Sequence, residues 1–250
     1  MVALKSLEES LRETGNLENF SRALSHPIQK VRETTALLFA IAYALEQKKL
    51  NRDYVVYGGY SVLLQLARTV GIEAIALWRG SYDIDMVGSE KVVESIKEQY
   101  RVISDRVSPN VRGKRTLRVQ IDETEPIKID IRQKEEFLDE PSEVYYQDIE
   151  TVELFGIPVN VLTLERQLKD KLSITRRNLQ RDREDIYTLL GLLYLRGSEP
   201  VTLAHALDLN QRRKLYDMLK GVKYIKEEVL VEPDIPYLSN LKKALKKRGV

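Results

Sequence analysis

Two aspartates separated by one residue, Asp83 and Asp85, are the side chains of this sequence best suited to chemistry. On an extended strand, residues two apart point to the same face, so the two carboxylates would lie side by side. Ile84 and Met86 would then point into the core. Neighbouring carboxylates repel each other unless a cation lies between them. The pair therefore indicates a divalent-cation site, and a solvated strand end that carries two acids is the alternative.

A third carboxylate, Asp130, lies on a second predicted strand, at residues 126–131. This strand alternates isoleucines on one face with Lys128, Asp130 and Arg132 on the other. If it lies beside residues 83–87, three carboxylates could hold two divalent ions about 3.5–4 Å apart. Such a site would bind a nucleoside triphosphate and activate an acceptor hydroxyl. A plain surface charge is the alternative for Asp130.

A glycine pair, Gly58 and Gly59, separates a predicted strand at residues 54–57 from a predicted helix at residues 60–70. Glycine lets the backbone approach a ligand closely. The start of a helix presents unpaired N–H groups and the positive end of its dipole, which suit a phosphate. An ordinary turn is the simpler explanation for the glycine pair alone, and the nearby aspartates add weight to a phosphate site.

The composition restricts the chemistry to oxygen and nitrogen groups. The 250 residues include no cysteine and two histidines, which excludes disulfides, thiolate nucleophiles and cysteine zinc sites. Carboxylates favour hard cations such as Mg²⁺.

The net charge is only +2, so any nucleic-acid surface must be local. The basic stretches at residues 101–118 and 241–250 are candidates, although a solvated surface is the simpler explanation for both.

Hydrophobic periodicity predicts the elements that would position these groups. We expect an α+β fold with an N-terminal helical arm at residues 1–50, a small mixed α/β core at 51–160 and a helical C-terminal domain at 161–250. Residues 162–195 are expected to be helical, and Trp78 to be a core anchor. The longest apolar run has ten residues, short of the roughly 20 that cross a bilayer. We therefore expect a cytoplasmic protein without membrane association.

Two motifs resemble the nucleotidyltransferase superfamily of DNA polymerase β type, most closely its AbiEii/AbiGii toxin-like branch. That branch reads G-G-[ST]-[AS]-L and then R-x-S-x-D-[IL]-D. Residues 79–85 read R-G-S-Y-D-I-D and match the second motif in full. Residues 58–62 read G-G-Y-S-V, with Tyr60 where the branch has a small hydroxyl residue, and the spacing between the motifs is longer.

A later part of the chain also resembles this branch, which carries L-A-x-K-L and [KR]-D-x-x-D-[IL] elements. Residues 168–172 and 181–186 read L-K-D-K-L and R-D-R-E-D-I, with Arg177 between them. On one continuous helix, Lys171, Asn178, Asp182 and Asp185 would fall along one line beside an apolar stripe. Ordinary ion pairs along a helix are the alternative. The resemblance covers roughly residues 50–190.

The resemblance implies a small mixed β-sheet nucleotidyltransferase core with two Mg²⁺ ions held by Asp83, Asp85 and Asp130. It implies that Asp130 also favours deprotonation of the acceptor. The residues implied to contact the nucleotide are Gly58, Gly59, Ser61, Arg79, Ser81 and Lys171. Asp182 and Asp185 would either orient Lys171 or contact the base or the acceptor.

The function expected from this resemblance is transfer of a nucleoside monophosphate from an NTP to a hydroxyl acceptor, with release of pyrophosphate. The acceptor would be an RNA such as tRNA, or a protein. A toxin-like role and an antitoxin partner follow from the resemblance alone. Two alternatives remain open, namely a non-catalytic nucleotide- or RNA-binding module of the same fold, and an NTP-dependent phosphotransferase.

Overall fold

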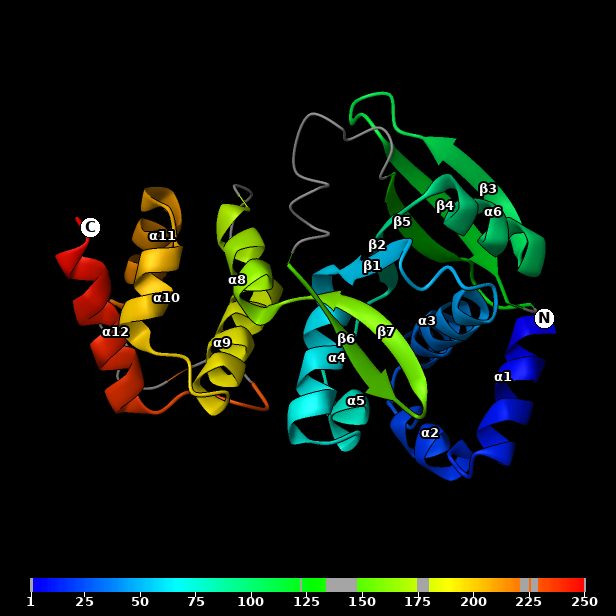
Figure 1. Ribbon diagram of the computed structural model, residues 1–250, viewed down its shortest axis with the longest axis horizontal. Helices are drawn as coiled ribbons and strands as arrows, with labels where there is room; N and C mark the ends of the chain where they lie inside the picture. Colours follow the sequence, from blue (N-terminus) through cyan, green and yellow to red (C-terminus); the bar gives the residue numbers. More distant parts are fainter. Residues whose placement is uncertain are drawn as a thin grey trace. The chain divides into compact units, whose positions relative to one another are not determined.

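The computed structural model describes residues 2–121, 123–133, 148–174, 180–220, 225 and 229–249. The chain divides into two compact units, Met1–Leu162 and Thr163–Val250. The first unit combines helices with a seven-stranded mixed sheet, and the second is helical in its described part (Figure 1). The α+β fold class expected from the sequence is confirmed.

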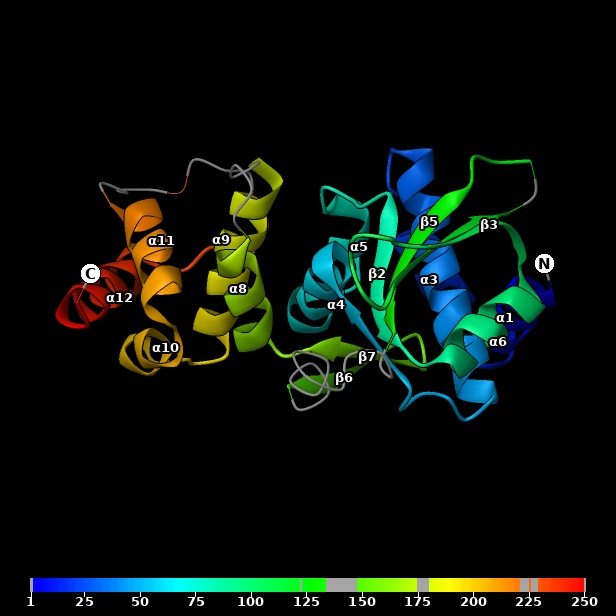
Figure 2. The same cartoon turned by 90° about the horizontal axis from the view of Figure 1, so that it is seen from above.

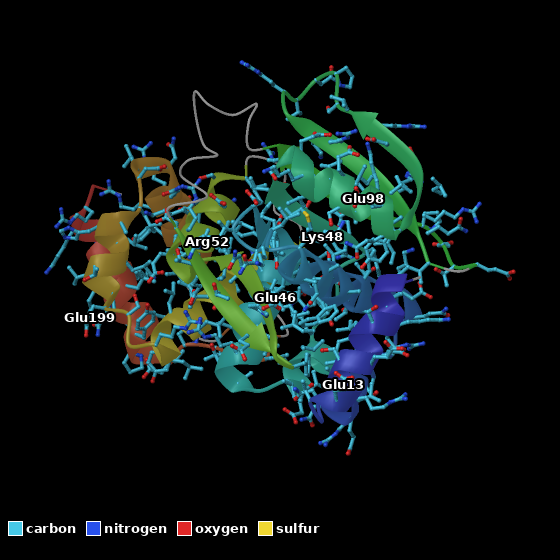
Figure 3. All side chains as sticks on the ribbon, turned by 45° about the vertical axis from the view of Figure 1, so that its right-hand side comes forward. Glu13, Glu46, Lys48, Arg52, Glu98 and Glu199 are labelled. Carbon is cyan, nitrogen blue, oxygen red and sulfur yellow. The ribbon has the colours of Figure 1, made fainter. Side chains whose placement is uncertain are left out.

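The first unit begins with three helices, α1 (Val2–Glu13), α2 (Leu17–Ala23) and α3 (Gln29–Gln47). Helix α3 is apolar around most of its surface and packs against α1, β2 and β7, so it is a core helix of this unit. Just after it, Lys48 pairs with Glu98 of α6 at 2.5 Å (Figure 3). The first 50 residues therefore fold together with the sheet.

The sheet has the strand order β3-β4-β5-β2-β1-β7-β6. Pairs β2–β5 and β1–β7 are parallel, and the other neighbouring pairs are antiparallel. The parallel pairing of β2 with β5 brings two distant stretches of sequence side by side at the centre of the sheet. The strands are β1 (Tyr54–Tyr57), β2 (Asp83–Gly88), β3 (Arg101–Val107), β4 (Lys114–Gln120), β5 (Ile127–Gln133), β6 (Ile149–Leu154) and β7 (Ile157–Leu162).

Three helices connect the strands of the first unit: α4 (Gly58–Val70), α5 (Glu73–Leu77) and α6 (Glu90–Gln99). Helix α6 lies against β2 and β3 (Figures 1 and 2). A Cβ added at Gly88 of β2 would lie within 3.6 Å of both Val92 of α6 and Ile131 of β5. This contact shows that α6 covers the face of the sheet onto which the isoleucines of β5 project.

The second unit contains α8 (Leu164–Ser173), α9 (Gln180–Leu195), α10 (Pro200–Ala206), α11 (Leu209–Leu219) and α12 (Ile235–Lys247). Side chains of Thr163, Asp208 and Asp234 cap the starts of α8, α11 and α12, and these caps satisfy N–H groups that the helix itself leaves unpaired. The prediction of one continuous helix from residue 162 to 195 is wrong, because α8 ends at Ser173 and Ile174 has an extended backbone. Arg177 and Asn178 lie outside the described residues.

Across the described ranges, none of the helices combines the length and the apolar character needed to cross a bilayer.

Candidate active site

Three carboxylates come together on the two central strands of the sheet. Asp83 and Asp85 lie on β2, and Asp130 on β5 is directly opposite Asp85 in the parallel register. Opposed residues of neighbouring strands project from the same face, so all three side chains share one face. Ile84 and Met86 point the other way and are completely buried. The apolar positions thus fix which face carries the acids, as the alternation in the sequence predicts.

The start of α4 lies directly against Asp85. Gly58 has a left-handed backbone with φ +69°, and a Cβ added there would lie 2.5 Å from Oδ2 of Asp85. A Cβ added at Gly59 would lie 3.5 Å from Oγ of Ser81. The glycine pair therefore allows the helix start, Asp85 and Ser81 to approach each other. Unpaired N–H groups at this end suit the negative charge of a carboxylate or a phosphate.

The loop before β2 is anchored in the core. Trp78 is buried, as expected, and its carbonyl lies 2.8 Å from Nε2 of His26. The guanidinium of Arg79 stacks on the Trp78 ring at 4.7 Å. Tyr60 donates a hydrogen bond to the Ser81 carbonyl at 3.3 Å. Burial raises the pKa of Tyr60, so its hydroxyl stays protonated and able to donate.

Tyr60 thus has a positioning role that the sequence motif did not reveal. It stands where the AbiEii/AbiGii motif has a small hydroxyl residue, and its ring lies 5.9 Å from the Trp78 ring. Ser61 is completely buried, and its Oγ has no hydrogen-bond partner within the described structure. In this conformation Ser61 is not accessible to a nucleotide. Ser81 instead lies at the site and donates to Oδ1 of Asp83 at 3.0 Å.

Asp130 is held by three donors that sequence reasoning did not assign. Thr116 donates to Oδ1 at 2.7 Å, and Oδ2 accepts from Lys128 at 2.7 Å and lies 2.8 Å from Lys114. Burial by itself would raise the pKa of Asp130, but these donors outweigh it and hold the pKa below its usual value. Asp130 is therefore an ionised, buried carboxylate. One of these donors could have been found from the sequence, because Lys128 lies two residues before Asp130 on the same strand face.

Lys128 also links Asp130 to Asp83, whose Oδ2 lies 3.7 Å from the same ammonium group. The two carboxylate oxygens can therefore be no farther apart than the sum of these two contacts. Among the residues that the structure describes, no group of three acidic or histidine side chains has the arrangement of a metal site. The donor set of Asp83 and Asp85 fits a hard cation. Asp130 could join it only after Lys128 moves, because the lysine occupies the space between them.

Lys171, Asp182 and Asp185 form an ion-pair cluster within the second unit. Nζ of Lys171 lies 2.6 Å from Oδ2 of Asp185 and 3.5 Å from Oδ1 of Asp182. Both aspartates are buried. The cluster joins two helices, α8 and α9, whereas the sequence pattern predicts it on one continuous helix. These ion pairs favour the alternative in which the aspartates orient Lys171.

Comparisons with known proteins agree with this geometry at the level of fold. No protein-family model matches the chain, and no curated protein matches it. Among solved structures, an antigenic nucleotidyltransferase-like protein from Paracoccidioides brasiliensis superposes with a TM-score of 0.50 and 14% sequence identity. The match covers 85% of this chain and 93% of that one. The chain therefore has a nucleotidyltransferase-like fold.

Proposed function

We propose that this protein is a magnesium-dependent nucleotidyltransferase that transfers a nucleoside monophosphate from an NTP to a hydroxyl acceptor and releases pyrophosphate. The observation that carries the proposal is the contact of Asp85 with the start of α4, with Asp83 on the same face of β2 and Asp130 opposite Asp85 on β5. A nucleotidyltransferase-like fold supports the same activity. A cytoplasmic location, the AbiEii/AbiGii branch, a toxin-like role and an antitoxin partner remain predictions.

Each group of the site has a physical role in this reaction. Asp83 and Asp85 would hold a divalent ion, which would neutralise charge on the phosphates. The N–H groups at Gly58 and Gly59 and the hydroxyl of Ser81 would bind phosphate oxygens. Arg79 would counter the charge that develops on the leaving pyrophosphate. Asp130, kept ionised by its lysine and threonine partners, would accept a hydrogen bond from the acceptor hydroxyl and orient it.

A second candidate is a nucleotide-binding module of the same fold without catalysis. The observation that favours it is the engagement of Asp130 with Lys114 and Lys128, since these lysines already neutralise the third carboxylate. A phosphotransferase would use the same groups but would transfer the terminal phosphate. The nucleotidyltransferase and the phosphotransferase differ in which phosphate of the nucleotide reaches the acceptor, and the binding module transfers none.

The test is incubation with Mg²⁺, total RNA or cell lysate, and each NTP labelled at either the α- or the γ-phosphate. We expect transfer of the α-label. The double variant Asp83→Asn/Asp85→Asn should lower the rate on the order of 100-fold or more, because the charge for the cation is lost. Asp217→Asn, an exposed aspartate of α11, is the matched control and should retain the wild-type rate.

Each other outcome identifies an alternative. Transfer of the γ-label alone would establish a phosphotransferase. Nucleotide binding without transfer of either label would establish the binding module. Transfer of the α-label that survives loss of both aspartates would show that the site lies elsewhere.

A further inference from the structure

The strands β3, β4 and β5 carry a row of basic side chains on one face. Cross-strand partners project from the same face. The register opposes Arg118 to both Ser104 and Lys128, and opposes Lys114 to Arg132. It likewise opposes Arg106 to Thr116, and Arg101 to Gln120. We call this surface the cationic face, and its basic members are Arg101, Arg106, Lys114, Arg118, Lys128 and Arg132.

The cationic face is continuous with the candidate active site. Lys128 is opposite Asp83 and Asp130 is opposite Asp85 in the β2–β5 register. The acids of β2 therefore lie on the same side of the sheet as the basic residues of β5, β4 and β3. A chain of phosphates lying along the face could thus end at the carboxylates.

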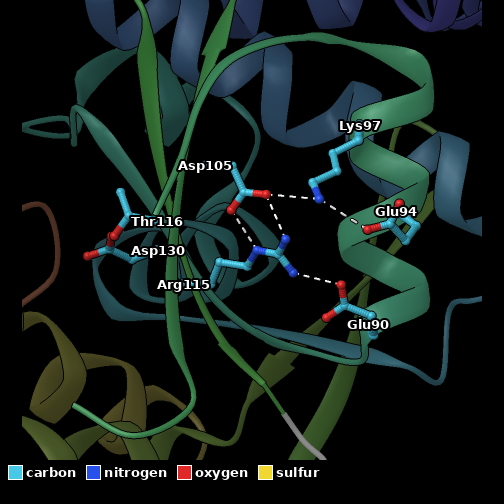
Figure 4. Close-up of polar contacts among 7 residues, drawn as sticks. All are labelled: Glu90, Glu94, Lys97, Asp105, Arg115, Thr116 and Asp130. Atoms are coloured by element: carbon cyan, nitrogen blue, oxygen red, sulfur yellow. Dashed lines mark hydrogen bonds and ion pairs between the residues drawn. The ribbon is translucent and has the colours of Figure 1, made fainter. Parts of the chain in front are cut away.

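The other side of these strands is apolar and is covered. Leu117 and Val119 of β4 and the isoleucines of β5 are completely buried there. Arg115 also projects to this side, where it pairs with Asp105 and with Glu90 of α6, each at 2.6 Å. Figure 4 shows this network on the α6 side of the strands, with Thr116 and Asp130 pointing the opposite way. Arg115 is therefore neutralised and does not belong to the cationic face.

Several charges of the cationic face have no ion-pair partner among the described residues. Arg101, Arg106 and Arg118 are exposed and form no ion pair within the described part of the chain. Asp130 is the acid that β3, β4 and β5 contribute to this face. Like charges this close are unfavourable unless an anion compensates them. The charge pattern therefore fits a polyanion.

We propose that the cationic face binds the phosphate backbone of a folded RNA, which is the hydroxyl acceptor; this rests on the proposed function. Residues 101–133 contain no aromatic side chain on which bases could stack. Recognition is therefore through phosphates. Ser104 and Gln120 lie among the basic residues and offer hydrogen bonds to ribose 2′-hydroxyls, which DNA lacks.

The first experiment measures fluorescence anisotropy of a labelled RNA hairpin, and of a DNA hairpin of the same sequence, with the full chain at several salt concentrations. We expect RNA to bind more tightly than DNA and the logarithm of the affinity to fall linearly with that of salt. Arg106→Glu/Arg118→Glu should weaken RNA binding more than about 10-fold and reduce the salt slope by about 1.5–2. Thermal unfolding checks that this variant and its control are folded.

The matched control is Lys246→Glu/Lys247→Glu, which makes the same charge change on exposed residues of α12. It should change RNA affinity less than about 2-fold, since these residues belong to the second unit and not to the cationic face. Equal losses in the two variants would overturn the proposal, because only net charge would then matter. Absence of RNA binding at low salt would also overturn it, and equal binding of the DNA hairpin would overturn the assignment to RNA.

A second measurement separates this inference from the proposed function. Asp83→Asn/Asp85→Asn should lose label transfer but still bind the RNA hairpin. One outcome is that label transfer is absent with every NTP while Arg106→Glu/Arg118→Glu still weakens RNA binding. That result would contradict the proposed function and support RNA binding by the cationic face. If label reaches a protein at the same rate in wild type and Arg106→Glu/Arg118→Glu, the proposed function stands and the RNA assignment fails.

Discussion

Lys128 forms ion pairs with two of the three candidate metal-binding carboxylates, Asp130 and Asp83. Its ammonium group lies 2.7 Å from Asp130 and 3.7 Å from Asp83, so it occupies the region in which a shared cation would lie. A lysine in this place reduces the repulsion that two facing acids would otherwise experience. The side chain is partly exposed and has a flexible stem, so it can withdraw when a stronger cation arrives.

Gly58 is the residue whose replacement tests the contact between α4 and Asp85. Gly58→Ala should lower the free energy of unfolding by about 2–3 kcal/mol, because it adds a clash with Oδ2 to the strain of a positive φ. Gly15→Ala is the matched control, since Gly15 has φ +71° and nothing within 4 Å of an added Cβ. It should cost about 1 kcal/mol. Urea unfolding measures both.

A third variant removes the atom that causes the clash. In an Asp85→Ala background, the cost of Gly58→Ala should fall to that of Gly15→Ala. Equal costs for the two glycines in the wild-type background would show that Asp85 does not contact the start of α4.

For single residues, the sequence predicted which face of the sheet carries the carboxylates but not which side chains contact them. The alternation of charge and isoleucine placed Asp130 on the face of Asp83 and Asp85, and the register agrees with that placement. Thr116 and Lys114 lie on a different strand, and their contact with Asp130 depends on the β4–β5 register, which no local pattern specifies. The burial of Ser61 and the support from Tyr60 likewise depend on how α4 packs.

Among the elements, α6 is joined to the β3–β4 hairpin by one ion-pair network. Asp105 on β3 pairs with Arg115 on β4 and with Lys97 on α6, and Arg115 also reaches Glu90 (Figure 4). The Arg115 hydrogen bond lowers the pKa of Asp105 to about 2. The network therefore fixes the hairpin to the helix on the side opposite the cationic face.

Asp105→Asn should destabilise the protein by about 1–2 kcal/mol at pH 7, after allowance for partial exposure of the pair. Because the folded-state pKa is depressed, this contribution is present above the unfolded value of about 3.9 and is lost as the pH falls towards about 2. Urea unfolding from pH 7 downwards should show the two proteins converging below pH 4.

The control for this prediction is Glu94→Gln. Glu94 pairs with Lys97 one turn along the exposed side of α6, and such pairs contribute less than about 0.5 kcal/mol. A gap between wild type and Asp105→Asn that stayed constant from pH 7 to pH 3 would contradict the ionic origin of the effect.

Elements with a strong local pattern were predicted well. The strand at residues 54–57 and the strands carrying the acids agree with β1, β2 and β5, because alternation and flanking glycines mark them. The prediction of one helix over residues 162–195 missed the break at Ile174, since no proline or glycine marks it in the sequence. Helix α8 packs against α9, an arrangement that one continuous helix could not form.

The whole chain consists of two compact units that meet in sequence between Leu162 and Thr163. The first contains the sheet and its own buried core, in which Phe20, Phe39 and Phe155 pack edge to face. The candidate carboxylates and the cationic face belong to this unit, and the Lys171 cluster belongs to the second. Each unit has the contacts expected of an independent domain.

Residues 1–162 produced alone should fold and unfold in a single cooperative transition, monitored by circular dichroism during heating. This fragment should retain RNA-hairpin binding, because the complete cationic face lies within it. It should lose label transfer if Lys171 has the role implied by the resemblance.

The matched truncation, residues 1–126, lacks β5, which pairs with both β2 and β4. It should show no cooperative transition. A cooperative transition in the shorter fragment, or none in the longer one, would contradict this division of the chain.

The parallel pairing of β2 with β5 also has a consequence for folding. Asp85 and Asp130 are neighbours in the sheet, yet the helix α6 and the whole β3–β4 hairpin come between them in the chain. Closing so long a loop is entropically costly and slow compared with forming the antiparallel β4–β5 and β1–β2 pairs. We therefore expect the acids to meet late, after the hairpin has formed. A partly folded or nascent chain would contain Asp83 and Asp85 without Asp130, and would have no complete site with which to act on an NTP.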